Sequence, residues 1–181
     1  MALKATIFKA ELQVSDMERN YYHHHSLTIA RHPSETDERM MVRLLAFALH
    51  ADDALAFGRG LSTDDEPDLW HKDLTGAIET WIDVGLPDEK SLRKACGRSK
   101  HVFVYSYGGR SAELWWDQVG SELERQKNLT VRKLPLSTSL AIAKLAKRNM
   151  QLQCTIQERE IWFSDGAETV HVELETAIGE A

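Results

Sequence analysis

The fold of this chain is decided by two segments, EPDLWHK at residues 66–72 and ETWIDVG at residues 79–85. Both have the alternating character of β-strands, in which residues two apart share a face. In the second segment Glu79, Trp81 and Asp83 therefore point to one side of the strand. The residues that we expect on the opposite, apolar side are Ile78, Ile82 and Val84.

Acidic side chains gather at one end of the hairpin that these two strands would form. Asp68 shares a face with Trp70 and Lys72 in the first strand. If the strands pair, Asp68 lies near Asp83, with Lys72 and Glu79 farther along the same face. Ionised carboxylates repel one another, so such a cluster persists where it binds a cation or where water screens it. The hairpin is therefore a candidate cation site.

Length, charge and cysteine content restrict the classes of protein to consider. The chain has 181 residues, and we expect one domain over residues 1–181. The net charge of −6 disfavours a basic nucleic-acid coat protein, although it leaves room for a local basic patch. Cys96 and Cys154 are far apart, so neither a disulfide framework nor a zinc ribbon is indicated. No apolar run is long enough for a membrane span and the first residues lack a signal-peptide pattern, so we expect a cytoplasmic protein without membrane contact.

The rest of the chain alternates strand and helix patterns. Residues 5–14 and 21–31 read as an antiparallel strand pair, and a hairpin is expected around Ser164-Asp165-Gly166. Helices are expected from Ser34 as N-cap to about residue 51, and at 87–98, 111–126 and 138–148, the last capped by Ser137. Further strands are expected at 54–58, 101–107 and 129–134. A strand–helix–strand connection makes the strands at 77–84 and 101–106 parallel neighbours. The predicted class is α/β, with a mixed β-sheet flanked by helices.

Two other groups of residues are weaker candidates for a site. His23, His24 and His25 are adjacent on a strand, so only His23 and His25 share a face, and we expect no metal site there. Glu38 lies at the edge of the buried stripe of the first helix. It is interpreted either as an acid that favours the helix N-terminus or as a side chain that reaches toward the carboxylate cluster.

The order of helix, three strands, helix and strand resembles the core of the PD-(D/E)xK nuclease superfamily. Pro67-Asp68 matches the first half of its motif, and Ile82-Asp83-Val84-Gly85 matches the second half except that Gly85 replaces the lysine. The resemblance implies a restriction-endonuclease-like core, with the N-terminal strand pair and the C-terminal hairpin as additions. It also implies Mg²⁺, or Mn²⁺ in its place, held by Asp68 and Asp83.

Nearly the whole chain also resembles the YaeQ family of small bacterial proteins. The matching segments are Met1-Ala2-Leu3-Lys4-Ala5-Thr6-Ile7, Ala30-Arg31-His32-Pro33-Ser34-Glu35-Thr36, Arg39-Met40-Met41, Trp81-Ile82, Gly85-Leu86-Pro87-Asp88-Glu89, Lys94-Ala95-Cys96 and Ile161-Trp162. That family is similar in fold to restriction endonucleases, so the resemblance informs the fold more than the activity.

Two functions of different class follow from these patterns. The first is a metal-dependent phosphodiesterase acting on DNA or RNA, with Asp68 and Asp83 as metal ligands. Its supporting acids would be Glu38 and Glu79, and its cation would be Lys94, Lys90 or Lys72. The second is a catalytically inactive nuclease-fold protein that binds a nucleic acid or a protein of the expression machinery. Fold does not imply function, so both are carried forward, and the oligomeric state is left open.

Overall fold

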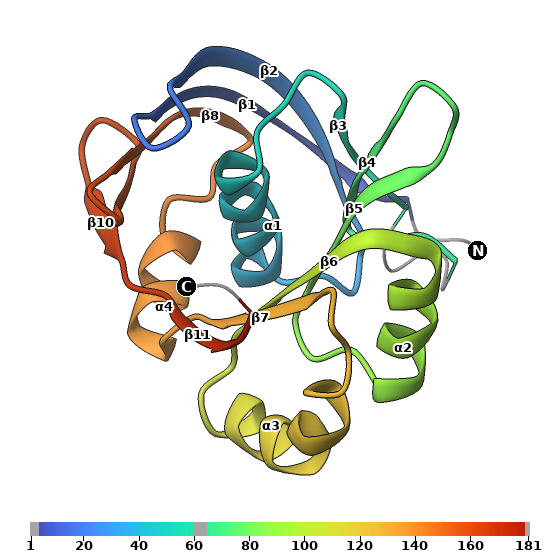
Figure 1. Ribbon diagram of the computed structural model, residues 1–181. Coiled ribbons are helices and arrows are strands. Elements are labelled where there is room, and N and C mark those ends of the chain that lie inside the picture. Colours follow the sequence, from blue (N-terminus) through green and yellow to red (C-terminus); the bar gives the residue numbers. More distant parts are fainter. Residues whose placement is uncertain (1–3, 60–64, 180–181) are drawn as a thin grey trace. The chain divides into compact units, whose positions relative to one another are not determined.

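The computed structural model describes residues 4–59 and 65–179, and in that part of the chain it shows an α/β protein with two mixed sheets and four helices (Figure 1). The contacts divide the chain into two compact units. The first comprises Met1–Ala51 and Ser137–Glu173, and the second comprises Asp52–Leu136 and Leu174–Ala181. The α/β class is thereby confirmed, while the single domain over residues 1–181 stays a prediction. No described helix is long and apolar enough to cross a membrane.

The first unit is built on a sheet that joins the two ends of its sequence. Its described strands lie in the order β10-β9-β8-β1-β2. Their bounds are β1 Thr6–Asp16, β2 Tyr21–Arg31, β8 Asn149–Gln157, β9 Glu160–Ser164 and β10 Thr169–Val172. β1 pairs antiparallel with β2, as predicted, and parallel with β8. The strand pattern does not predict the second pairing, because it joins segments more than 130 residues apart.

The C-terminal part of this sheet contains two hairpins where one was predicted. The expected turn joins β9 to β10 around Asp165. A second turn joins β8 to β9 at Glu158 and Arg159, which both have positive φ angles, of 52° and 67°. Non-glycine residues rarely adopt this conformation, so the sequence carries no turn signal there.

The helix α1 (Asp37–Leu49) lies against this sheet (Figure 1). It begins later than predicted because Thr36, and not Ser34, is its N-cap, with the Thr36 hydroxyl accepting the Arg39 N–H at 3.1 Å. Every residue from Met40 to Ala48 is buried, so the helix is covered on all sides and not along one stripe. The ring of Phe47 meets His25 of β2 edge to face, with centroids 5.1 Å apart.

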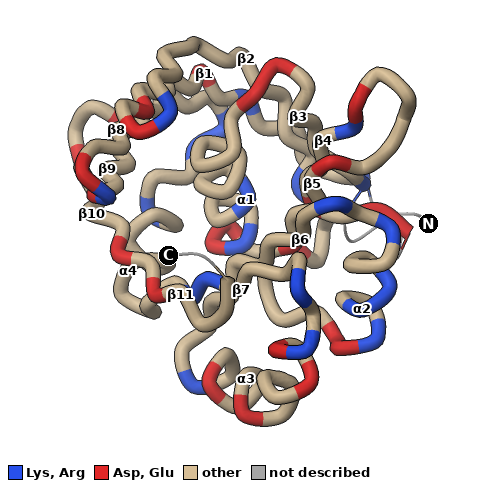
Figure 2. The backbone as a smooth tube through the Cα atoms, viewed as in Figure 1, with Lys and Arg blue, Asp and Glu red and all other residues tan. Residues whose placement is uncertain are grey.

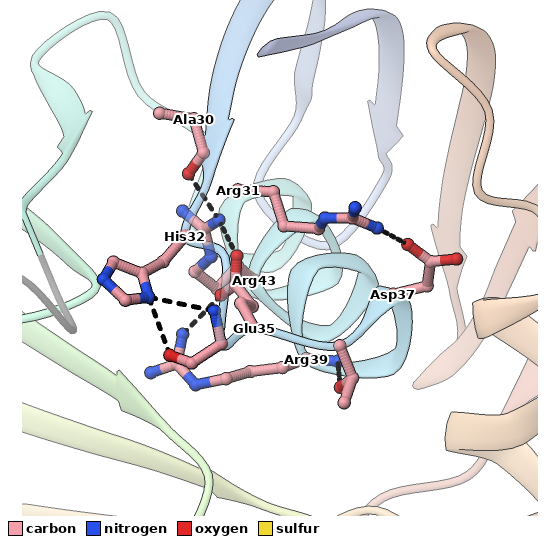
Figure 3. A network of polar contacts seen from close by, with 9 residues as sticks. Ala30, Arg31, His32, Glu35, Asp37, Arg39 and Arg43 are labelled. Atoms are coloured by element: carbon pink, nitrogen blue, oxygen red, sulfur yellow. Dashed lines mark hydrogen bonds and ion pairs between the residues drawn. The ribbon is translucent and has the colours of Figure 1, made fainter. Parts of the chain in front are cut away.

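A buried ionic network fixes the start of α1 to the end of β2 (Figure 3). The Glu35 side chain is 2% exposed and accepts hydrogen bonds from Arg43 at 2.5 Å and from Arg39 at 2.6 Å. Arg43 also donates to the Ala30 carbonyl at 3.2 Å. The motif around His32-Pro33-Ser34-Glu35 therefore has a structural role, because Glu35 neutralises a buried guanidinium.

The last helix of the chain that the structure describes is α4 (Leu136–Ala143). It is shorter than the helix predicted at 138–148.

The second unit contains the hairpin from which the sequence analysis began. Its described strands lie in the order β11-β7-β6-β5-β4-β3. The bounds are β3 Leu55–Phe57, β4 Leu69–Lys72, β5 Ile78–Val84, α2 Glu89–Arg98, β6 Ser99–Ser106, α3 Arg110–Leu123, β7 Leu129–Lys133 and β11 Glu175–Ile178. β4 and β5 are antiparallel, and β5 and β6 are parallel neighbours joined by α2. The predicted pairing of the strands at 77–84 and 101–106 is thus confirmed.

The core of the second unit lies between its sheet and the helices α2 and α3 (Figure 1). Trp81 of β5 packs there with Leu92 of α2 and Trp115 of α3. Ile78 packs against the same cluster, although strict alternation predicts that it points to the other face. The cause is a register shift after His71, where Lys72 pairs with Ile78, because a bulge changes the face on which a side chain emerges.

Replacing Glu35 by alanine is expected to lower the free energy of unfolding by about 3–5 kcal/mol, because the Arg43 charge would remain buried without its carboxylate. The matched control is Asp37→Ala, which removes the exposed partner of Arg31. An exposed pair contributes about 1 kcal/mol or less. Urea denaturation followed by circular dichroism measures the free energy of unfolding of both variants. Equal, small losses of this free energy would contradict a structural role for Glu35.

Candidate functional site

The register of the β4–β5 hairpin bears on the predicted pairing of Asp68 with Asp83. Leu69 pairs with Ile82 and Trp70 pairs with Trp81. Continuing this register by one residue sets Asp68 directly across from Asp83. Side chains opposite one another on paired strands have Cβ atoms roughly 4.5–5.5 Å apart. The observed pairing ends at Leu69, so the proximity of the two carboxylates stays a prediction, which this register favours.

Asp68 is a buried acid that also joins the two strands. It is 3% exposed, and its carboxylate accepts the Val84 N–H at 2.9 Å. Its carbonyl accepts the Gly58 N–H at 3.0 Å. Part of the carboxylate's hydrogen-bonding capacity is thus used to hold the backbone of β5. Asp68 has a structural role whether or not it also binds a cation.

Asp83 is half-buried and is oriented by the core of the unit. Its carboxylate accepts the indole N–H of Trp81 at 3.0 Å. Trp81 is held in turn by the edge-to-face ring of Trp70, with centroids 6.1 Å apart, and by Arg98, whose guanidinium lies 5.4 Å from the Trp81 ring. The packing of one tryptophan therefore sets the position of this acid.

Glu79 and Lys72 lie at the other end of the hairpin. Each is four residues from the acid on its own strand, a separation of about 13 Å at roughly 3.3 Å per residue. Glu79 approaches Lys100 at 3.6 Å, and the Lys72 amine lies 3.8 Å from the centre of the Trp70 ring. At this separation Glu79 cannot share one small cation with Asp68 and Asp83, and the Lys72 ammonium lies at the other end of the hairpin from them.

The remaining predicted residues lie on helices. Lys90 and Lys94 are exposed on α2, on the side opposite to its buried residues. Glu38 belongs to the first unit, on α1, where it accepts a hydrogen bond from Ser139 at 3.2 Å. Asp68 and Asp83 are thus the predicted site residues at the open end of the β4–β5 hairpin.

The chemistry of the pair fits Mg²⁺ better than a softer metal. Mg²⁺ prefers oxygen ligands and is commonly held by one or two carboxylates, with water and phosphate completing its coordination. Within the described ranges, no group of three or more His, Cys, Asp or Glu side chains is arranged to hold a metal ion. A site at Asp68 and Asp83 would therefore bind Mg²⁺ weakly in the absence of a phosphate ligand.

Gly85 occupies the position at which the nuclease motif has its lysine, and its backbone explains the difference. Its φ is +101°, a conformation that side-chain-bearing residues rarely adopt. Its N–H donates to the Tyr105 carbonyl at 2.9 Å, which holds the chain in this turn. A Cβ atom at Gly85 would meet nothing within 4 Å, so the constraint is conformational and not steric.

The histidines of β2 and the two cysteines have surroundings of their own. His23 and His25 share a face of β2, as the alternation predicts, with ring centroids 4.7 Å apart. His24 lies on the opposite face and contacts Glu11 at 2.5 Å. Burial raises the pKa of the Cys96 thiol to about 11 and that of Cys154 to about 12, so neither is a thiolate nucleophile at neutral pH.

A basic surface on α2 and the first residues of β6 was not recognised as a unit in the sequence. Between residues 89 and 100 the chain has five basic residues and one acid, a local charge of +4 in a chain of −6 (Figure 2). The exposed basic residues are Lys90, Arg93, Lys94, Arg98 and Lys100. The signal is the spacing of Lys90 and Lys94, and of Lys94 and Arg98, since residues four apart share a helix face.

Replacing Gly85 by alanine or by lysine is expected to lower the free energy of unfolding by about 1–3 kcal/mol, because either residue must adopt a positive φ. The control is Gly97→Ala in α2, where the new Cβ meets nothing within 4 Å and φ is not positive. That change should instead stabilise the protein by about 0.5–1 kcal/mol. Thermal or chemical denaturation measures the difference, and a stabilising Gly85→Lys would contradict the argument.

Comparison with known proteins confirms the resemblance to the YaeQ family. The model of the YaeQ protein family matches residues 1–174. Proteins described as "uncharacterized protein YaeQ" from Salmonella typhi and Escherichia coli K12 are 45% and 46% identical over 174 residues, which is 96% of each chain. The crystal structure of the YaeQ protein from Xanthomonas axonopodis pv. citri is 50% identical, with a TM-score of 0.91 over 95% of this chain and 97% of that one. The Pseudomonas syringae YaeQ structure is 37% identical, with a TM-score of 0.93 over 97% of both chains. The chain belongs to the YaeQ family.

Proposed function

We propose that this protein is a metal-dependent phosphodiesterase that acts on nucleic acid, with Mg²⁺ or Mn²⁺ held by Asp68 and Asp83. The observation that carries the proposal is the register of β4 and β5, in which Leu69 pairs with Ile82; one further step of the same register would set Asp68 opposite Asp83. The parallel pairing of β5 and β6 through α2 supports it, since this is the connection that a restriction-endonuclease-like core requires.

The residues around the pair suit a phosphate ester in specific ways. Asp68 is held by the Val84 N–H and Asp83 by the Trp81 indole, so both acceptors are positioned before a cation arrives. A Mg²⁺ ion bound there would neutralise charge on the phosphate and lower the pKa of a bound water. The acids themselves would fix the coordination geometry and orient that water against the phosphorus.

The basic surface of α2 supports nucleic acid as the substrate. Phosphate backbones are bound mainly by Lys and Arg, through counterion release. Lys90 and Lys94 are one helical turn apart and exposed, in the same unit as the acid pair. Arg93 is partly neutralised by Glu89 at 3.2 Å. The surface would therefore contact phosphates at some distance from the reacting group.

The second candidate, an inactive nuclease-fold protein that binds nucleic acid or a protein of the expression machinery, is favoured by a different observation. A lysine at position 85 is disfavoured by the positive φ, and Lys90 and Lys94 are exposed on the outer side of α2. General-base assistance to the attacking water would then be weak. Binding without cleavage is the outcome that this candidate predicts.

We expect Mg²⁺- or Mn²⁺-dependent cleavage of single- or double-stranded DNA or RNA, which Asp83→Asn and Asp68→Asn both abolish. Asparagine at position 68 keeps an acceptor for the Val84 N–H, so the fold should survive. Added Mg²⁺ should also raise the melting temperature of the unmodified protein and not that of Asp83→Asn. Binding of nucleic acid without cleavage under any metal would favour the inactive protein. The absence of both nucleic-acid binding and a Mg²⁺ effect would refute the phosphodiesterase.

Reversing two charges on α2, with Lys90→Glu and Lys94→Glu together, should weaken nucleic-acid binding and reduce its salt dependence by about two phosphate contacts. The matched control is Arg125→Glu with Lys127→Glu, which changes the net charge equally at exposed positions after α3. Fluorescence anisotropy at several salt concentrations measures how steeply the affinity of each variant for nucleic acid falls with salt. If both double substitutions weaken nucleic-acid binding equally, α2 is not the contact surface and only the net charge of the protein matters.

A further inference from the structure

A groove in the first unit lies between α4 and the edge of the sheet. Its volume is about 760 Å³, within the roughly 300–1,000 Å³ of ligand sites. One wall is formed by α4 and the residues that follow it, where Thr138, Ala141 and Leu145 recur at helical spacing. The other wall is β10. The groove is therefore bounded by one helix and one strand of the same unit.

Three consecutive residues of β10, Thr169, Val170 and His171, line this groove. Successive side chains of a strand point to opposite faces of the sheet. A groove that all three residues line must therefore run along the edge of the strand and not over one face. This edge is where the backbone N–H and C=O groups of β10 point away from β9.

The outer edge of β10 is a hydrogen-bonding surface. β10 is the last strand of its sheet, and no strand within residues 4–59 and 65–179 pairs with its outer edge. Asp165 N–H donates to the Glu168 carbonyl, so this pair is hydrogen-bonded, and bonded pairs alternate along an antiparallel ladder. Val170 and Val172 therefore bond to β9, and the backbone groups of Thr169 and His171 face the groove.

The side chain of His171 is held away from this edge. Its ring stacks on Trp162 of β9 with centroids 4.3 Å apart, and it contacts Glu160. Edge strands are commonly protected by proline, by lysine or by a bulge. The sequence Thr169-Val170-His171-Val172 contains neither proline nor lysine, and its pairing with β9 shows no register shift. The edge is thus left accessible to a further strand.

The charge of the helix wall indicates the kind of ligand. Lys144 and Lys147 line the groove beyond the end of α4, and Lys144 makes no ion pair with any residue that the structure describes. The acid on the other wall, Asp165, accepts the N–H groups of Glu168 and Ala167, so it is used within its turn. These backbone hydrogen bonds lower the pKa of Asp165, with Lys147 contributing. Glu168 is the remaining exposed acid, at the turn end of the groove.

We propose that this groove binds a short, extended, acidic peptide segment of a partner protein. The peptide adds a strand to β10 through the backbone groups of Thr169 and His171, and its carboxylates pair with Lys144 and Lys147. Strand addition between a sheet edge and a helix is an established mode of peptide recognition, in which the main chain supplies affinity and side-chain pockets supply specificity. The buried Thr138, which is 7% exposed, lies at the helix wall where it can bond a peptide side chain.

The test uses the full chain, labelled with ¹⁵N, and a pool of eight-residue synthetic peptides in which glutamate alternates with randomised apolar residues. We expect the amide resonances of Thr169 and His171 and of the Thr138–Leu145 segment to shift on titration. Thr169→Pro removes an outward N–H and should weaken binding at least about tenfold, whereas the control Thr169→Ala keeps that N–H and should bind nearly as well. Both variants lose the Thr169 hydroxyl, which bonds to Ser164, so they differ only in the backbone.

The contribution of charge is tested by comparing Lys144→Glu with Lys127→Glu. The second variant changes the net charge equally, but in the other unit. Only Lys144→Glu should weaken the binding of the glutamate peptides. Peptides with lysine in place of glutamate should not shift the amide resonances of β10. The proposal is overturned if the glutamate pool leaves Thr169 and His171 unshifted, or if Thr169→Pro and Thr169→Ala bind alike. Shifts of the same amides on raising the protein concentration without peptide would overturn it in favour of a second copy of this chain.

Discussion

The packing of Trp81 is the interaction on which the second unit depends. Its indole ring lies in the core between the sheet and the helices α2 and α3, and its N–H reaches out of that core to Asp83. Trp70 and Arg98 enclose the same ring from the strand side and from α2. Because one side chain both fills the core and orients the acid, the candidate site cannot shift without repacking the unit. The packing of Trp81 in the core thus holds the Asp83 carboxylate in one orientation before any ligand binds.

The first unit depends on a different constraint, the neutralisation of a buried arginine. Arg43 lies in the middle of a helix that is buried on all sides, and Glu35 supplies its counter-charge from the turn before that helix. Leaving a charge unpaired in such a place is costly, so the turn must adopt one conformation. The segment from Ala30 to Arg39 therefore has a role in folding, because it carries both the acid and one of the arginines of this network.

The two proposed sites use opposite kinds of structure. The acid pair is held by backbone and indole donors before any ligand binds, which suits the positioning of a small cation. The edge of β10 offers only main-chain groups and a cationic helix wall, which suits a flexible peptide that brings its own strand. The sites lie in different units of the chain, so a variant at one can be studied with the other intact. A nuclease-like activity and a protein partner are therefore compatible in one molecule.

The sequence alone determined the α/β class, the β4–β5 hairpin and the parallel β5–β6 connection, because each follows from local periodicity and short connections. It did not determine the bulge that turns Ile78 into the core, the positive φ angles of Glu158 and Arg159, or the true N-cap at Thr36, since local propensities there are weak. Only the tertiary structure decided that β1 pairs with β8, that Asp68 bonds the Val84 backbone and that the edge of β10 faces a helix. These features join residues that are distant in the sequence, and no local pattern encodes which distant partner a strand edge or a buried carboxylate will meet.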